Sequence, residues 1–406
     1  MKITFYSNFL THHQLPFCLE MYKKYGEDFK FVSMEKINEE RISLGYKDMD
    51  NDYSFVLKAY ESKEKYKEAT KLALDSDIVI AGSTPTDDYI TERLKKDKIT
   101  FRYYARIFYN GVLSIFDFKN SRKVYNRHLK YKNNKNLYLL CASSYGPNDF
   151  NELGMYKDKC FKWGYFPETK IYNIEDLLKQ KENEKIEIIW VGRFIKEKHP
   201  EYVVKLAQKL KEKNYNFEIK MIGNGQLFDK IKKQIEKDNL INQIKLVGAV
   251  KSDKVREYME KANIFICTSD KNERWGVVLN EAMNSGCAVI AYKGIGGVPF
   301  LIKNNENGLA YTRLDDFYKK TIKVIDNKEL REKLSINAYK TISEVWTAKV
   351  AVQNFEKLVN SILEGKPNPV KEGPASTAQP VKWNNFIQLV DYKIIFVIKC
   401  HYKYDI

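Results

Sequence analysis

Residues 264–291 read IFICTSDKNERWGVVLNEAMNSGCAVIA, the pattern of a strand, a helix and a second strand. The apolar runs Ile264–Cys267 and Ala288–Ala291 predict buried strands, because each is short and polar residues follow it. Residues 277–285 between them predict a helix, and Gly286 suits a left-handed helix end. Strand, helix and strand in this order are typical of a parallel sheet covered by helices.

The same alternation extends through the C-terminal half of the chain. Three further short apolar runs predict strands, and charged segments with helical periodicity separate them. These strands are expected at residues 186–191, 217–222 and 244–247. Right-handed crossovers place the carboxyl ends of all these strands at one edge of the sheet, where open α/β sheets bind ligands.

The first ~165 residues predict a second α/β unit with less regular spacing. Its expected strands lie at residues 3–6, 29–33, 78–81, 99–101 and 137–142. A chain of 406 residues is long enough for two domains with cores of their own. The fold class is therefore α/β, with two doubly wound parallel sheets, and we expect the functional site in a cleft between them.

Composition restricts the class of protein. A hydrophobic fraction of 44% excludes a disordered or collagen-like chain. A net charge of +16 favours phosphates, nucleotides, acidic glycans or anionic lipid as partners. The six scattered cysteines show no zinc-binding spacing, so reduced thiols in the cytoplasm are expected. No run approaches the ~18 apolar residues of a membrane span.

The segment between the two quoted strands also carries candidate binding residues. Gly276 precedes the predicted helix, whose free N–H groups and dipole create a site for a diphosphate. Glu273 lies before the helix and Glu281 within it, so two carboxylates flank that site and can accept hydrogen bonds from sugar hydroxyls. The alternative is that Glu281 caps or pairs along its own helix.

Three motifs in order make the sequence recognisable. Glu273 and Glu281 are eight positions apart with Trp-Gly between them, and residues 191–198 (VGRFIKEK) and 221–225 (MIGNG) come before them. Together they resemble the donor-site signature of retaining glycosyltransferase family 4, whose members have the GT-B fold. The resemblance is strong over residues 185–300.

This resemblance implies a role for each matching residue. Arg193 and Lys198 would stabilise the negative charge that develops on a departing nucleotide diphosphate, without a metal. Glu273 would contact the transferred hexose, and Glu281 the ribose hydroxyls. The other implied donor-binding residues are Gly192, Gly223, Trp275, Gly276, Val277 and Val278. Neither a metal nor a cofactor is expected beyond the nucleotide sugar itself, most simply a UDP-sugar, and the anomeric configuration should be retained.

The GT-B resemblance also predicts the division of the chain. Residues 1–167 would form a Rossmann-like acceptor-binding domain and residues 168–344 the donor domain, with a helix at 345–364 returning to the first domain. Residues 365–382 predict a flexible linker, because they are rich in Pro and Gly. Besides Gly365, these are Pro367, Pro369, Gly373, Pro374 and Pro380. The apolar tail at 383–406 is either a packing segment or a membrane-surface anchor.

The sequence departs from the family pattern on the donor side as well as on the acceptor side. Arg274 stands where a glycine is common, and Phe300 where a glutamate is usual. His12 and His13 occupy the loop after the first strand, where members often have paired glycines. A neutral imidazole there can orient a sugar hydroxyl, or the two rings can simply pack within the loop.

Segments 140–143 and 162–167 are similar to those of family members from bacterial surface-polysaccharide gene clusters. A glycan acceptor on a lipid carrier would then bring the enzyme to the inner face of the membrane. A basic cluster could hold it at an anionic leaflet, or could be a merely solvated face. Its members are Arg122, Lys123, Arg127, Lys130 and Lys132.

Three other functions compete with this interpretation. A nicotinamide dehydrogenase is excluded, because no Gly-x-Gly-x-x-Gly motif follows the first strand. A nucleotide-sugar epimerase of the same fold stays open. So does a non-enzymatic basic protein that binds glycans or nucleic acid, although the Glu273/Glu281 pair argues against a phosphate backbone at that site, and we expect no nucleic-acid partner.

Overall fold

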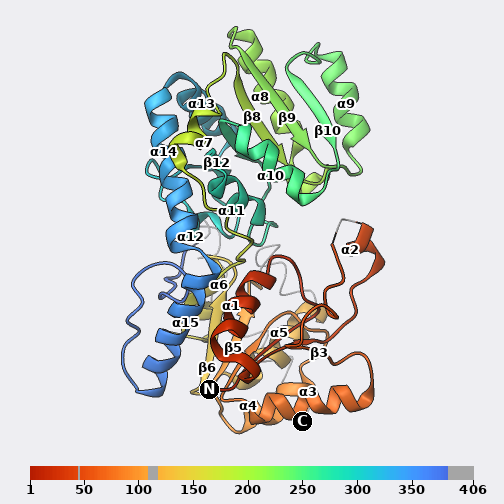
Figure 1. Cartoon of the computed structure of the whole chain (residues 1–406), viewed down its shortest axis with the longest axis vertical. Helices are drawn as coiled ribbons and strands as arrows, with labels where there is room; N and C mark the ends of the chain where they lie inside the picture. The colour runs from red at the N-terminus through yellow and green to blue at the C-terminus, as the bar shows by residue number, and fades with distance from the viewer. Residues whose placement is uncertain (44–45, 108–117, 383–406) are drawn as a thin grey trace.

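A computed structural model describes residues 1–43, 46–107 and 118–382 of the chain. Figure 1 shows two α/β domains, with the C-terminal domain in green above the N-terminal domain in red and yellow. All strand pairs between named strands are parallel. The predicted fold class, two doubly wound α/β domains, is confirmed.

The N-terminal sheet has seven strands in the order β3-β2-β1-β4-β5-β6-β7. Its strands are β1 (Ile3–Ser7), β2 (Phe29–Ser33), β3 (Val56–Lys58), β4 (Ile78–Ala81), β5 (Thr100–Tyr104), β6 (Leu137–Cys141) and β7 (Cys160–Lys162). Its helices are α1 (Leu15–Tyr25), α2 (Glu39–Ser43), α3 (Lys63–Asp75), α4 (Thr91–Lys95), α5 (Phe118–Arg127) and α6 (Gly146–Glu152).

The C-terminal sheet has six strands in the order β10-β9-β8-β11-β12-β13. Its strands are β8 (Ile186–Val191), β9 (Phe217–Ile222), β10 (Ile244–Gly248), β11 (Ile264–Cys267), β12 (Ala288–Tyr292) and β13 (Leu309–Tyr311). Its helices are α7 (Ile174–Lys179), α8 (Pro200–Glu212), α9 (Phe228–Lys237), α10 (Ser252–Lys261), α11 (Val277–Asn284), α12 (Val298–Leu301), α13 (Leu314–Asp326) and α14 (Lys328–Lys340). β11 is buried along its whole length, because helices cover both faces of a parallel sheet.

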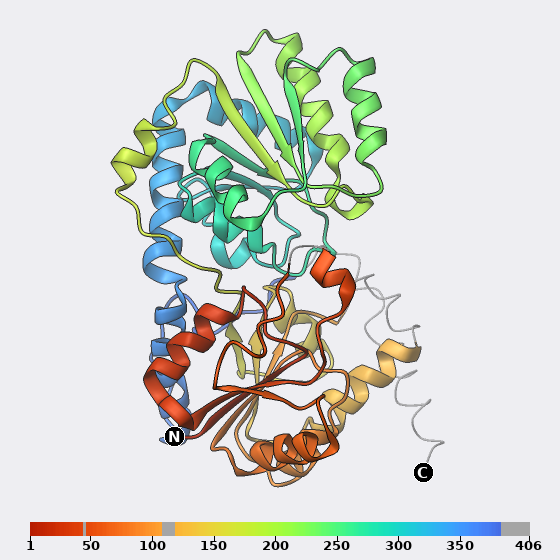
Figure 2. The ribbon, with the colours of Figure 1, turned by 45° about the vertical axis from the view of Figure 1, so that its right-hand side comes forward.

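The chain returns to the N-terminal domain after α14. A π-helical turn at Thr341–Val345 leads into α15 (Ala348–Leu363), which packs against α1. In α15, the Phe355 ring lies 5.0 Å from that of Phe101 and 5.8 Å from that of Trp163. Figures 1 and 2 show α14 and α15, in blue, following each other along one side of both domains.

The segment after α15 is not the flexible linker that its Pro and Gly content predicts. Lys162 N donates to Ser376 O at 2.7 Å, Ala375 N to Lys162 O at 2.7 Å, and Ala378 N to Cys160 O at 2.9 Å. Residues 374–378 therefore run antiparallel to β7 and cover the edge of the sheet. An edge strand has unpaired backbone groups, and these hydrogen bonds satisfy them. We call residues 366–382 the strap.

Within the described part of the chain, no helix is long and apolar enough to cross a membrane. The five cysteines found there are all buried and unpaired.

Candidate active site at the domain boundary

The loop after β8 is held by direct backbone contact with the turn after β9. Gly192 N donates to Ile222 O at 3.0 Å, and Phe194 N to Asn224 O at 2.9 Å. A Cβ on Gly223, whose φ is +133°, would lie 2.0 Å from Gly192 O. Gly223 is therefore required for this close approach, and it acts by shaping the loop that carries Arg193.

Lys198 is positioned by a buried hydrogen-bond relay between β8 and β11. The indole N–H of Trp190 donates to Thr268 Oγ1 at 2.8 Å, and that hydroxyl donates to Lys198 O at 2.6 Å. Both side chains of the relay are buried. The backbone at Lys198 is thus fixed by the sheet, while its ammonium group extends from a short 3₁₀ turn, Lys196–Lys198.

Gly276 is the N-cap of α11 and is in the left-handed conformation, with φ 82° and ψ 61°. A Cβ at this position would come within 3.0 Å of Ile295 Cγ2, so glycine suits both the conformation and the space. Val277 and Val278 form the first turn and are half-buried. Their N–H groups have no partner within the helix, so they can bind an anion.

The structure brings Lys198 and Glu273 together as an ion pair between Nζ and Oε2. Their side chains are 18% and 21% exposed, so the pair is partly shielded from water. Arg193, in contrast, is exposed and has no ion pair with a described residue. Two residues that the sequence assigns to one donor site therefore do converge.

Glu281 lies half-buried in α11 and has no hydrogen bond or ion pair with any residue that the structure describes. Burial raises the pKa of its carboxyl from 4.5 to about 7, against the opposing effect of Arg256. In the described residues, no hydrogen bond or ion pair of the Glu281 side chain supports the alternative in which Glu281 caps or pairs along its own helix. The carboxyl is free to accept hydrogen bonds from a ligand.

Trp275 has a different place from the one that its motif suggests. Its side chain is 1% exposed and donates from Nε1 to Asn280 Oδ1 at 2.8 Å. A Cβ on Gly164 would lie 2.2 Å from the indole, and the Trp346 ring is 5.6 Å away. The indole therefore packs the domain boundary and cannot contact a donor, so a donor contact at Trp275 would have to use its backbone.

His12 and His13 lie in the loop after β1, with ring centroids 3.7 Å apart. Burial and the neighbouring His12 lower the pKa of His13 to about 3, so its ring is neutral at physiological pH. Nδ1 of His13 is buried without a hydrogen-bond partner in the described chain. The ring lies 6.2 Å from that of Tyr165, whose hydroxyl interacts electrostatically with Glu273 and Arg274 of the other domain. The two histidines thus reach the same boundary as the donor-side residues.

The predicted basic cluster does not form one surface patch. Arg127 is buried, with Nε 3.6 Å from Asp87 Oδ1, and it also donates to Pro85 O at 3.1 Å. Lys123 is exposed but interacts with Arg127 and with Arg274 across the boundary. The prediction that Arg127 belongs to a basic surface patch is therefore wrong, because the partly buried carboxylate of Asp87 holds its guanidinium group inside. Arg122, Lys130 and Lys132 are exposed as well.

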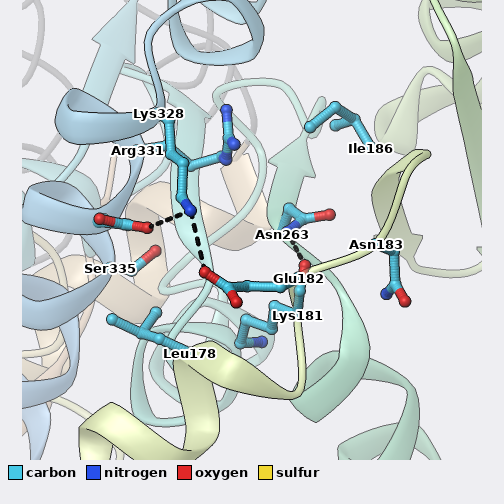
Figure 3. A pocket seen from close by; sticks show the side chains of 10 residues that line it. Leu178, Lys181, Glu182, Asn183, Ile186, Asn263, Lys328, Arg331 and Ser335 are labelled. Carbon is cyan, nitrogen blue, oxygen red and sulfur yellow. Dashed lines mark hydrogen bonds and ion pairs between the residues drawn. The ribbon is translucent and has the colours of Figure 1, made fainter.

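A depression of about 350 Å³ lies elsewhere on the C-terminal domain. Figure 3 shows it between Ile186, at the start of β8, and the ion pair of Lys328 with Glu182. Gly192 follows the opposite end of β8, so this depression is separate from the candidate site. The described residues contain no group of three or more His, Cys, Asp or Glu side chains arranged to hold a metal ion.

Comparison with known families bears on the C-terminal domain. Residues 174–341 match the family model described as "Glycosyl transferases group 1", and this segment contains Arg193, Lys198, Glu273 and Glu281. The C-terminal domain is therefore similar to the group 1 glycosyl transferases.

Two curated glycosyltransferases are similar to part of the chain. One is MJ1178 of Methanocaldococcus jannaschii, 29% identical over 178 residues, which are 43% of this chain and 48% of that protein. The other is the amylovoran biosynthesis glycosyltransferase AmsK of Erwinia amylovora, 29% identical over 152 residues, or 36% of each chain. The chain thus spans about half or less of each of these relatives.

One solved structure is similar to this chain over both domains. Anabaena HepE in complex with UDP and glucose superimposes with a TM-score of 0.62 at 17% identity, covering 89% of this chain and all of that one. The chain therefore shares the two-domain GT-B fold of this neighbour. The similarity includes the N-terminal domain, which lies outside the family match.

Proposed function

We propose that the protein is a retaining glycosyltransferase that moves a hexose from a nucleotide-diphosphate sugar, most simply a UDP-hexose, to a sugar acceptor. The observation that carries this proposal is the ion pair of Lys198 with Glu273, which lies beside Gly276 at the start of the helix that carries Glu281. These residues lie in the segment that matches the group 1 glycosyl transferases. That HepE binds UDP and glucose supports the choice of donor.

In the proposed reaction the bond between the anomeric carbon and the β-phosphate oxygen breaks while an acceptor oxygen bonds to that carbon. The acceptor proton passes to the departing phosphate on the same face, so configuration is retained. Lys198 and Arg193 stabilise the growing charge on the diphosphate, and the first-turn N–H groups of α11 bind it. Glu281 accepts hydrogen bonds from the ribose, and Glu273 from the sugar.

For the acceptor, we propose a lipid-linked oligosaccharide of a bacterial surface polysaccharide. The printed role of the Erwinia relative in amylovoran biosynthesis supports this choice. His12 and His13 approach Glu273 through Tyr165, so a hydroxyl that they orient would lie near the transferred hexose. The enzyme would then work in the cytoplasm, at the inner face of the membrane.

The experiment that tests the proposal is incubation of the full chain with UDP-glucose, UDP-galactose, UDP-N-acetylglucosamine and GDP-mannose. We expect slow hydrolysis of one UDP-sugar, with release of UDP and of a sugar that keeps its configuration at C1. Release of an epimerised sugar would instead identify an epimerase. If no donor binds or is hydrolysed, the proposed function is contradicted.

The proposed chemistry also predicts activity without a divalent metal. Lys198 and Arg193 supply the positive charge that a metal provides in other enzymes, so UDP release should be unchanged in EDTA. The control is a known metal-dependent glycosyltransferase under the same conditions. Loss of activity in EDTA with recovery in Mn²⁺ would count against the roles of these two cations.

A further inference from the structure

Two buried arginines share one carboxylate where β5 approaches the domain boundary. Arg102 Nη2 lies 2.8 Å from Asp87 Oδ2, and Arg127 Nε lies 3.6 Å from Asp87 Oδ1. Arg102 Nη2 also donates to Arg127 O at 2.9 Å, so the two residues are in direct contact. Among the described residues, the Asp87 carboxylate is the one carboxylate that pairs with both guanidinium groups.

Two exposed cations border this buried pair, one from each domain. Lys123 comes from α5, and Arg274 comes from the loop that precedes α11. Burial lowers the pKa of Lys123, and the like charges of Arg127 and Arg274 lower it further. Tyr104, at the end of β5, interacts electrostatically with Arg127 and Arg274 as well. Lys123, Arg127 and Arg274 thus interact electrostatically across the boundary.

Polar nitrogens in this region have no partner. Nε of Arg102 and Nε2 of His128 are buried without a hydrogen bond to any described residue, and both side chains are at most 2% exposed. The His128 ring lies 5.0 Å from that of Tyr104. Excess buried positive charge and unsatisfied nitrogens destabilise a folded protein. Such perturbed charged groups cluster at functional sites, where a ligand can supply the missing charge.

We propose that a phosphate group carried by the acceptor binds against Lys123 and Arg274, in the positive field of Arg102 and Arg127. This inference rests on the proposed function, because it assigns the anion to the acceptor. Arg274 directly follows Glu273, so the phosphate would lie next to the hexose that is transferred. The diphosphate of the donor has its own ligands at Lys198 and at the start of α11, so the two anions do not compete.

The test uses the full chain saturated with UDP, which fills the donor site. Binding of sn-glycerol 3-phosphate is followed by ligand-observed ³¹P NMR, with glucuronate as a carboxylate competitor. Dihexanoyl phosphatidic acid, a water-soluble lipid, forms the second arm. We expect Lys123→Gln and Arg274→Gln each to raise the Kd for glycerol phosphate about tenfold, the usual effect of losing one charge-assisted hydrogen bond. Lys135→Gln, which removes an exposed cation of the same domain outside the proposed site, should leave the Kd unchanged, and Lys123→Arg should retain binding.

The outcomes separate the two proposals. Tighter binding of the lipid than of glycerol phosphate, with the same loss in both variants, would show that the phosphate belongs to a lipid carrier. Equal affinities would show recognition of the phosphate alone. UDP binding without any response to glycerol phosphate, equal Kd values in all variants, or equally strong competition by glucuronate would overturn the inference. Failure of the wild type to bind UDP would instead contradict the proposed function.

Discussion

At the scale of single residues, the pairing of Lys198 with Glu273 is the feature on which the proposed catalysis most directly depends. Lys198→Ala should lower the kcat for UDP release about 10²–10³-fold, because a fixed cation is lost where charge develops on the leaving group. Arg193→Ala should have an effect of similar size. The measurement is steady-state UDP release from the donor identified in the panel.

Lys196→Ala is the matched control, since Lys196 is an exposed cation on the same turn. Its kcat should equal that of the wild type. Full activity in both Arg193→Ala and Lys198→Ala would remove the assigned role.

Glu281 combines a binding role with a cost in stability. Its carboxyl has a pKa near 7 in the folded protein against 4.5 as its ordinary value, so the folded state binds more protons between these values. The contribution of Glu281 to the free energy of unfolding therefore falls as pH rises from about 4.5 to 7. Glu281→Gln cannot ionise, so its Tm relative to the wild type should be higher at pH 8 than at pH 5, while its affinity for UDP falls.

Thermal melts at the two pH values and a UDP titration measure the two effects. A Tm difference that does not change between pH 5 and pH 8 would show that Glu281 is not held in a raised-pKa environment. Unchanged UDP affinity would separately remove its contact with the ribose.

Sequence reasoning located these charged residues but not the place of Trp275. The charged residues belong to short sequence motifs, and their spacing along the chain indicates which of them lie at the same site. The indole of Trp275 is buried by Gly164 and Trp346, which are distant in sequence and meet it only after both domains have folded. The ion pair of Arg127 with Asp87 was missed for the same reason.

At the scale of elements, the strap is a non-local feature of the N-terminal sheet. Its Pro and Gly content predicts a linker, yet its backbone pairs with β7, itself a strand of three residues too short to recognise from its sequence. β3 and β13 have the same length and were missed likewise. The longer strands were predicted because a fully buried strand must be a continuous apolar run.

Ala375 tests the strap directly. It is fully buried, has a φ of +64°, and donates its N–H to Lys162 O. Ala375→Pro removes the donor and cannot adopt this φ, so we expect the free energy of unfolding to fall by roughly 3 kcal/mol. Chemical denaturation measures the loss.

Ala375→Gly is the control, because glycine adopts a positive φ readily and keeps the N–H group. It should stay within about 1 kcal/mol of the wild type. Equal stability of the Pro and Gly variants would mean that the strap does not hold the edge of β7.

At the scale of the whole molecule, the net charge of +16 divides into two classes of cation. Arg102 and Arg127 point their charge inward, toward Asp87 and the domain boundary. Arg122, Lys130 and Lys132 are exposed on the N-terminal domain. A basic cluster that looks uniform in the sequence can therefore serve two different anions, one at the boundary and one on an outer surface.

The exposed cations Arg122, Lys130 and Lys132 predict that the protein binds an anionic membrane surface. Each basic side chain near such a surface contributes about 1 kcal/mol, so neutralising Arg122, Lys130 and Lys132 together should weaken binding about a hundredfold. Co-sedimentation with vesicles of phosphatidylglycerol and phosphatidylcholine measures this effect, and binding should weaken at high salt because the attraction is screened. Lys135→Gln is the single-site control. Binding to pure phosphatidylcholine vesicles of the same strength, or no binding to either kind, would leave these three cations as a solvated surface and would place the encounter with the acceptor elsewhere on the molecule.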